Sequence, residues 1–143
     1  MAKADPFSIR LGTEDDRFVT AEARRLKRSR GSILAEYAAE GIRTRRYPGI
    51  AFRGEDHRRR AWVLGTGLDV WELVSLLRDF EDERTVANEY DLTLGQIRIA
   101  SAYAREFGDE IEALIEENRS LEHDLRRRYP FVQTLDEVAG GSG

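Results

Sequence analysis

The chain has 143 residues, of which 41% are hydrophobic and 35% charged, and its formal net charge is −4. This length suits one domain or two very small ones, and the composition favours a helix-rich protein. The lack of cysteine excludes disulfides and zinc–thiolate sites. No apolar run approaches the roughly 18 residues of a membrane span, and the N-terminus lacks the apolar segment of a signal peptide. We therefore expect a cytoplasmic protein with no membrane partner.

The charges are distributed unevenly along the chain. Residues 1–60 carry 15 Lys and Arg against 9 Asp and Glu, a net charge of +6, whereas residues 61–143 carry 8 against 18, a net charge of −10. A polyanion such as DNA would attract the first part and repel the second.

The first predicted element is a strand, "FSIRL". Phe7, Ile9 and Leu11 alternate with Ser8 and Arg10, which is the period of a strand with one buried face. The next forty residues contain no second strand, and an unpaired strand exposes its backbone donors and acceptors. We therefore expect the segment to pair with the same five residues of a second chain.

Two helices are predicted next. The first is expected to begin with the hydroxyl of Thr13 as its cap and Asp16 at the capping-box position. The second begins after the cap residue Ser29 and ends before the sequence Tyr-Pro-Gly at 47–49. Their apolar stripes comprise Phe18, Val19, Ala23 and Leu26, then Ile33, Leu34, Tyr37, Ala38 and Ile42. These stripes are too small for a core, so the segment requires a partner chain.

This strand–helix–helix order resembles the ribbon-helix-helix DNA-binding family of CopG, Arc and MetJ type. The resemblance covers residues 6–46 and depends on "FSIRL", the capped first helix, and "RSRGSI" at the start of the second helix. It implies an intertwined homodimer, or a higher even oligomer. The expected dimer core is formed by Phe7, Ile9, Leu11, Ile33, Leu34 and Tyr37.

The resemblance also implies a DNA-binding surface. Ser8 and Arg10 would read base edges in the major groove, with Arg10 able to make a bidentate contact to guanine. Pro6 departs from the family pattern because its ring offers no hydrogen bond, which limits the reading surface to two residues per strand. Backbone N–H groups would clamp a phosphate at Ser29, Arg30 and Gly31. The alternative is that Arg10 is a solvated charge on a half-buried strand.

The second part of the chain is predicted to begin with a β-hairpin, in which Ile50 and Phe52, then Trp62 and Leu64, flank a charged loop "GEDHRRR". A helix capped by Asp69 follows, with an apolar stripe of Val70, Leu73, Val74, Leu77 and Phe80. A short helix is predicted within 82–91. The next helix has Thr93 as its cap and Gln96 at the capping-box position.

This stretch resembles a small helical domain found in VapB-type antitoxins of bacterial toxin–antitoxin operons. The resemblance spans about 50–118 and depends on "AWVLGTGLDV" and "VANEYDLTLGQIRIASAYA"; Gly67 stands where the family usually has Arg. The expected fold is mainly α with short β: an N-terminal ribbon-helix-helix and a small helix-turn-helix-like C-terminal domain with a hairpin. The expected domains are 1–46, 47–120 and 121–143.

The helix pair at 82–107 could be a second DNA reader, because it has the pattern of a helix-turn-helix. Its second helix has little polar face, since Ile97, Ile99, Ala100, Tyr103, Ala104 and Phe107 are apolar. Residues 61–119 hold 5 Arg against 14 Asp and Glu, a net charge of −9, which repels a phosphate backbone. We therefore expect this pair to serve as core or as a protein interface.

A long helix is predicted at 109–128, with Ile111, Leu114, Asn118, Leu121 and Leu125 at heptad spacing. It could form a coiled coil whose register is set by Asn118, or pack on its own domain. We favour packing on its own domain because fewer than three heptads are marginal alone. The tail could dock on a partner through Tyr129, Phe131, Val132 and Leu135. The terminal "GGSG" is linker-like.

These observations favour an antitoxin of a type II toxin–antitoxin system. By family analogy it would neutralise a PIN-type ribonuclease toxin by direct binding and repress its own operon by binding operator DNA. The alternative is a stand-alone ribbon-helix-helix regulator whose second domain only drives oligomerisation. His57 and His123 are far apart, and the acids at 79–83 lie in a polar stretch. We therefore expect no enzyme activity, no metal and no cofactor.

Overall fold

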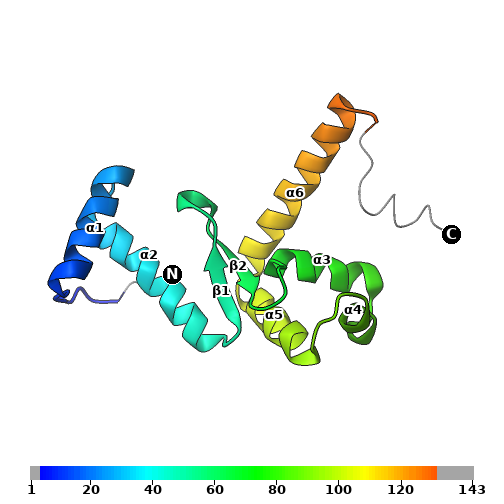
Figure 1. The fold of residues 1–143 in the computed structure, drawn as a ribbon, viewed down its shortest axis with the longest axis horizontal. Coiled ribbons are helices and arrows are strands. Elements are labelled where there is room, and N and C mark those ends of the chain that lie inside the picture. Colours follow the sequence, from blue (N-terminus) through cyan, green and yellow to red (C-terminus); the bar gives the residue numbers. More distant parts are fainter. Residues whose placement is uncertain (1–3, 132–143) are drawn as a thin grey trace. The chain divides into compact units, whose positions relative to one another are not determined.

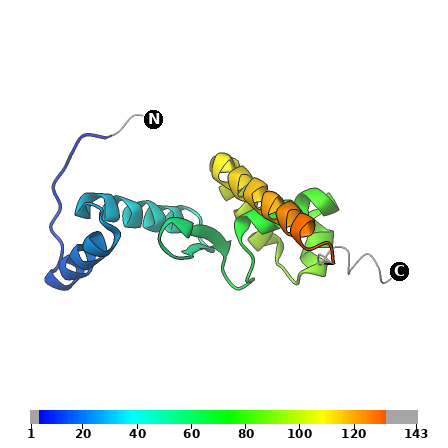
Figure 2. The same cartoon turned by 90° about the horizontal axis from the view of Figure 1, so that it is seen from above.

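A computed structural model describes residues 4–131 of the chain. The fold is mainly helical with one small two-stranded antiparallel sheet (Figures 1 and 2). The chain divides into two compact units, residues 1–46 and 47–143. Each unit is described by itself.

The N-terminal unit consists of α1 (Thr13–Leu26) and α2 (Arg30–Arg46), preceded by residues 4–12, which belong to no helix or strand of the single chain. Among the described residues of this unit, only Val19, Ala23 and Ile33 are buried. Leu11, Leu26 and Leu34 pack against them and are partly buried. The predicted strand at 7–11 stays a prediction, because its partner would be a second chain.

The start of α1 differs from the prediction. Gly12 is the N-cap residue, Thr13 is the first helical residue, and no side chain caps the helix. Glycine is accepted at this position, and the carbonyl of Gly12 takes the first hydrogen bond from the Asp16 N–H (2.9 Å). The Asp16 carboxylate instead forms an ion pair with Arg30 of α2. A charged partner on the neighbouring helix therefore replaces the predicted capping box.

The start and end of α2 follow the prediction. The Ser32 N–H donates a hydrogen bond to the Ser29 hydroxyl oxygen (3.1 Å), so Ser29 caps the helix. The helix ends at Arg46, directly before Tyr47, Pro48 and Gly49. Proline disfavours helical conformation in the residue before it, which explains this end.

The C-terminal unit begins with the predicted hairpin, β1 (Ile50–Arg53) and β2 (Arg60–Val63), joined through a short 3-10 turn at Asp56–Arg58. Ile50 lies opposite Val63 in the register, and both are buried against the helices. The loop requires glycine at position 54: φ is +105°, and a Cβ atom there would lie 2.2 Å from a backbone oxygen.

Four helices follow the hairpin: α3 (Val70–Phe80), α4 (Glu83–Glu89), α5 (Leu94–Glu106) and α6 (Gly108–Arg128). Helix α3 packs against each of the other three. Tyr103 of α5 is fully buried at the centre of the core, and its hydroxyl donates a hydrogen bond to Glu110 (2.7 Å). Its ring lies edge-on to Tyr47, with ring centroids 5.4 Å apart. This core is closed within the single chain.

The predicted caps of α3 and α5 are confirmed, and α4 has a cap that the sequence analysis did not predict. Asp82 accepts hydrogen bonds from the N–H groups of Arg84 and Thr85 at the start of α4. These bonds, the Thr85 hydroxyl bond first, hold the pKa of Asp82 below its usual range. Thr93 and Gln96 form the predicted capping box of α5.

Asp69 connects the hairpin to α3. The strand register places Arg53 directly opposite Arg60, a like-charged pair that is unfavourable by itself. The Asp69 side chain, only 3% exposed, accepts from Arg53 (2.7 Å), from Arg60 and from the indole N–H of Trp71 (3.2 Å). The guanidinium of Arg53 also lies 4.7 Å from the ring centre of Trp62. The Asp69 carboxylate thus neutralises a repulsion that the register creates.

Helix α6 is buried only near its start. Ile111 and Ile115 are buried and pack in the core, whereas Asn118, Leu121 and Leu125 are exposed. The first part of α6 therefore packs on its own domain, as the favoured alternative predicted. Within that part the buried residue is Ile115, and the predicted Leu114 is half-buried.

We expect Asp69→Asn to lower the free energy of unfolding of the C-terminal unit by about 2 kcal/mol. Breaking a buried ion pair costs about 3–5 kcal/mol, and exposure of the two arginines reduces this value. Both tryptophans, Trp62 and Trp71, lie in this unit, so urea unfolding followed by tryptophan fluorescence measures it selectively. Asp79→Asn, at an exposed position of the same helix, is the control. Equal stabilities of the two variants would contradict the role assigned to Asp69.

Candidate nucleic-acid interface

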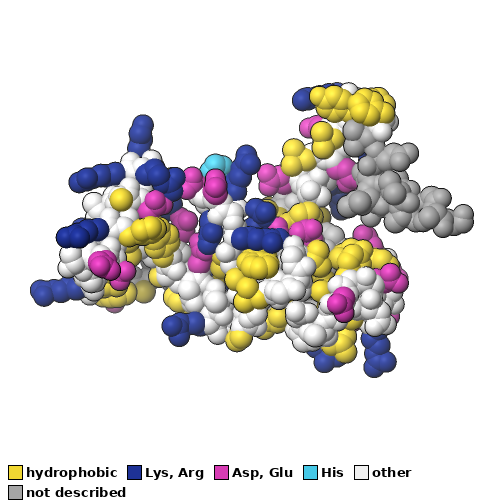
Figure 3. All heavy atoms as spheres, in the orientation of Figure 1, with side chains coloured by type: hydrophobic (Ala, Val, Ile, Leu, Met, Phe, Trp, Pro, Cys, Tyr) yellow, Lys and Arg dark blue, Asp and Glu magenta, His cyan; other side chains and the backbone are white. Residues whose placement is uncertain are grey.

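The N-terminal unit leaves large apolar side chains uncovered. Phe7 is 83% exposed and Ile9 62% exposed on the extended segment, and Phe18 of α1 is 60% exposed. Figure 3 shows hydrophobic side chains uncovered on this unit. Full burial of one such side chain is worth about 1.5–3 kcal/mol. A single copy of this unit therefore gains little hydrophobic stabilisation from these three side chains.

The predicted dimer-core residues are only partly brought together within one chain. Ile33 is buried, and Leu11 and Leu34 pack against the same small cluster. Phe7 and Ile9 are not part of this cluster, and Tyr37 is 39% exposed.

Tyr37 has an aromatic neighbour that the sequence analysis left out of the dimer core. Its ring centroid lies 6.4 Å from that of Phe18. Desolvation raises the pKa of Tyr37, and the carboxylates of Glu22 and Glu36 raise it further. The hydroxyl is therefore neutral at ordinary pH. The signal for Phe18 was present in the sequence, because it belongs to the same helical stripe as Val19.

The two predicted base-reading residues, Ser8 and Arg10, lie in the extended segment and are exposed. Pro6, beside them, is exposed as well. Their side chains are accessible to a ligand in the single chain. Residues 1–46 carry 11 Lys and Arg against 7 Asp and Glu, so the unit has a net charge of +4.

The start of α2 is open toward solvent. The backbone N–H groups of Arg30 and Gly31 lie in the first turn, where a helix offers no acceptor of its own. A Cβ atom on Gly31 would meet only the Ser29 hydroxyl, at 4.0 Å. The positive end of the helix dipole is therefore accessible to an anion. The side chain of Arg30 is paired with Asp16, so the predicted phosphate contact at this residue depends on its backbone N–H.

Arg28 rigidifies the turn between α1 and α2, a role that the sequence analysis missed. Its guanidinium donates to the Ser32 hydroxyl (2.7 Å) and to Glu36 (2.5 Å). Its backbone N–H bonds to the carbonyl of Ala23 (2.9 Å), across Lys27 in the left-handed conformation. These contacts fix the open helix start relative to α1.

The would-be recognition helix α5 contributes its apolar face to the core. Ile97, Ala100 and Tyr103 are fully buried, in agreement with the expectation that this helix serves as core. Arg98, on the same helix, has a side chain that is 68% exposed. The alternative that the helix pair at 82–107 binds DNA as a helix-turn-helix stays a prediction.

The predicted partner-binding residues lie at the end of the described chain. Tyr129 is 44% and Phe131 80% exposed, and their rings meet edge-on with centroids 5.9 Å apart. Val132 and Leu135 lie outside the described residues.

Residues 4–131 contain no group of three histidine or carboxylate side chains arranged to hold a metal ion. In the same range, no helix is both long and apolar enough to cross a membrane. Comparison of the sequence with protein-family models and with curated proteins, and of the fold with solved structures, found no match.

Proposed function

We propose that this protein is an antitoxin whose N-terminal unit binds operator DNA as a ribbon-helix-helix dimer and whose C-terminal unit binds and neutralises a partner toxin. The observation that carries the proposal is the extended segment before α1, with Phe7 83% and Ile9 62% exposed, next to two helices that bury only three described residues. That combination is what half of an intertwined dimer leaves uncovered.

Pairing of two extended segments would satisfy two needs of the N-terminal unit together. Antiparallel backbone hydrogen bonds would form between the two copies of residues 7–11. The apolar side chains of one strand face would then be covered by the four helices of the dimer. Strand alternation would leave Ser8 and Arg10 on the opposite face.

That opposite face suits the major groove. A two-stranded ribbon fits this groove, and an arginine that contacts guanine through two hydrogen bonds discriminates by about 1–3 kcal/mol. The open start of α2 and the net charge of +4 supply contacts to phosphates.

The C-terminal unit has the opposite charge. Residues 47–143 carry 12 Lys and Arg against 20 Asp and Glu, a net charge of −8. A ribonuclease must attract a polyanion, so its substrate surface is basic and complementary to this unit. The assignment of a PIN-type toxin depends on the resemblance to VapB-type antitoxins.

We expect Ile9→Asp to prevent dimerisation, because a carboxylate would be buried without a partner in the shared core. Sedimentation equilibrium of the full chain should show a monomer, with the tryptophan fluorescence of the C-terminal unit unchanged. Ser8→Asp, on the outer face of the strand, is the matched control and should remain dimeric. A dimeric Ile9→Asp variant would exclude the proposed strand pairing.

We expect Arg10→Ala to weaken binding to the DNA upstream of its own reading frame by about 1–3 kcal/mol and to relax the preference at one base pair. Fluorescence anisotropy at several salt concentrations separates this effect from a loss of phosphate contacts. Arg98→Ala, on α5, is the control and should bind normally. If Arg98→Ala weakened DNA binding and Arg10→Ala did not, base reading would be assigned to α5.

Co-expression with the product of the adjacent open reading frame tests neutralisation. The proposal predicts that the neighbour inhibits growth alone, that the full chain restores growth, and that the two proteins co-purify. If DNA binding is intact but no neighbour is toxic or bound, the chain is a stand-alone regulator.

A further inference from the structure

The second half of α6 presents an apolar face that the described residues of its own domain leave uncovered. The last buried residue of the helix is Ile115, and 13 helical residues follow it, about 20 Å of helix. Leu121 is 57% and Leu125 50% exposed on this part. Figures 1 and 3 show it extending away from α3–α5 with hydrophobic side chains uncovered. An isolated helix of this length is marginal in water, so this half of α6 would gain stability from a covering partner.

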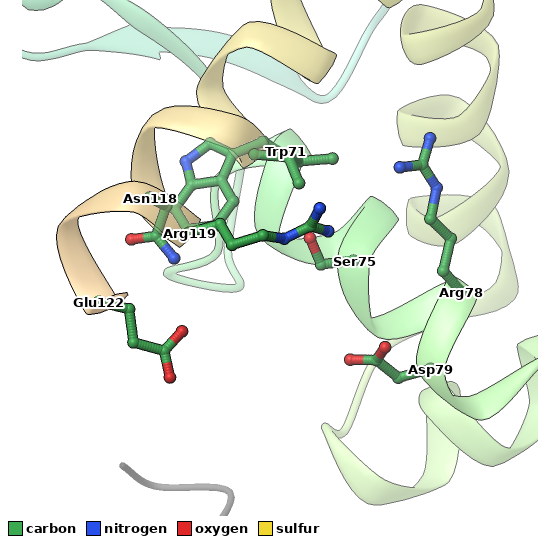
Figure 4. Close-up of a pocket in the computed structure, with 8 residues that line it drawn as sticks. Trp71, Ser75, Arg78, Asp79, Asn118, Arg119 and Glu122 are labelled. Carbon is green, nitrogen blue, oxygen red and sulfur yellow. The ribbon is translucent and has the colours of Figure 1, made fainter. Parts of the chain in front are cut away.

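Asn118, which belongs to the same heptad seam as the two leucines, also lines a groove between α3 and α6. The groove encloses about 340 Å³. Its lining comprises Trp71, Ser75, Arg78 and Asp79 of α3 and Ile115, Asn118, Arg119 and Glu122 of α6. Figure 4 shows Trp71, Asn118 and Arg119 around this hollow. The groove and the two leucines together offer a surface long enough for several turns of a helix, with a tryptophan at one end. Tryptophan is enriched among the residues that dominate binding interfaces.

The charges beside this surface disfavour a second copy of α6 as the partner. With Asn118 and Leu125 at heptad position a and Leu121 at d, the flanking positions e and g hold Glu117, Glu122 and Asp124. A parallel pair would place Glu117 opposite Glu122. An antiparallel pair would place Glu117 opposite Asp124 or, shifted by one heptad, Glu122 and Asp124 each opposite its own copy. Both arrangements oppose like charges.

The acids that disfavour self-pairing favour a basic partner. Glu122 is bonded to Arg126 (2.9 Å), which lies further from the seam at position b. Beside Leu121 and Leu125, the flanking positions e and g therefore hold only the three carboxylates. The two arginines of the groove are each paired with another acid, Arg78 with Glu112 and Arg119 with Glu116 (3.6 Å). Opposite charges at e and g select the partner of a helix.

We infer that the exposed half of α6, together with the Trp71 groove, is the docking surface for one amphipathic helix of a different protein, with an apolar stripe flanked by Lys or Arg. This inference deepens the proposed function and depends on its partner-binding part. It assigns partner binding to described residues 115–125 of α6 and to Trp71, upstream of the tail predicted from the sequence.

Two synthetic helices of the length of α6 test the surface directly on the full chain. Both have Leu at a and d and one Asn to meet Asn118. The basic probe has Lys at e and g, and the acidic probe has Glu there. Fluorescence anisotropy should show that the basic probe binds about tenfold or more tightly than the acidic probe. Equal binding of the two probes, or binding of neither, would overturn the inference.

Variants of α6 distinguish docking on the apolar seam from nonspecific attraction between a basic helix and acidic side chains. Leu121→Ser with Leu125→Ser should weaken the basic probe about tenfold or more, whereas Ser120→Ala with His123→Ser, on the opposite face, should not. Glu117→Lys with Asp124→Lys should reverse the preference between the two probes. This second variant keeps the test decisive if the Leu121→Ser, Leu125→Ser chain, called the serine variant below, loses helical structure. Undiminished binding of the basic probe to a folded serine variant would contradict docking on the seam.

Two other occupants of the surface give distinct results. If a second copy covers α6, the serine variant will have a lower mass than the unmodified chain in sedimentation equilibrium, which would overturn the inference. If the C-terminal end of the same chain covers the surface, removal of residues 132–143 will strengthen binding of the basic probe. That result would also overturn the inference.

The co-expressed neighbour separates this inference from the proposed function. Loss of co-purification with the serine variant supports both. A neighbour that still co-purifies with that variant would overturn the docking surface and leave the antitoxin proposal standing. Probe discrimination without any bound neighbour would leave the surface standing and refute the antitoxin proposal.

Discussion

The C-terminal unit depends on one buried carboxylate. Strand pairing in the hairpin brings Arg53 and Arg60 face to face, and Asp69 lies between them and the start of α3. The same residue is the N-cap of α3, where its backbone N–H donates to Glu72 (3.0 Å). Because α3 contacts α4, α5 and α6, the position of one side chain sets the orientation of the hairpin relative to the helical core. The exposed half of α6 is in turn placed by its packing on α3.

The two units achieve stability in different ways. The C-terminal unit surrounds a fully buried Tyr103 and leaves its hydroxyl bonded to Glu110. The N-terminal unit has only three buried residues in its described part and exposes Phe7 and Ile9. Under the proposed function, dimerisation would be a folding requirement for the DNA-binding unit, because the interface would supply the core that one chain lacks.

Sequence patterns predicted the elements whose causes are local. The caps at Ser29 and Thr93 depend on hydrogen bonds within one turn, and the helix end at Arg46 on the proline that follows. The predicted cap at Thr13 was wrong because Gly12 accepts the N-cap conformation and Asp16 finds a partner on another helix. Long-range features left no such signal. The contacts of Asp69 follow from strand register, the burial of Ile115 follows from the packing of α6, and the pairing of residues 7–11 requires a second chain.

Because the two units carry net charges of opposite sign, the proposed DNA binding and partner binding can occur in one molecule without interfering. In the proposed dimer, a net charge of +4 on each N-terminal unit attracts DNA, while a net charge of −8 on each C-terminal unit is repelled by it. In such a dimer, the acids beside Leu121 and Leu125 would also disfavour pairing of the two α6 helices. Each chain would then retain its own docking surface, so a DNA-bound dimer could hold two partners at once. Repression and neutralisation would thus use opposite ends of the chain and would not compete for the same residues.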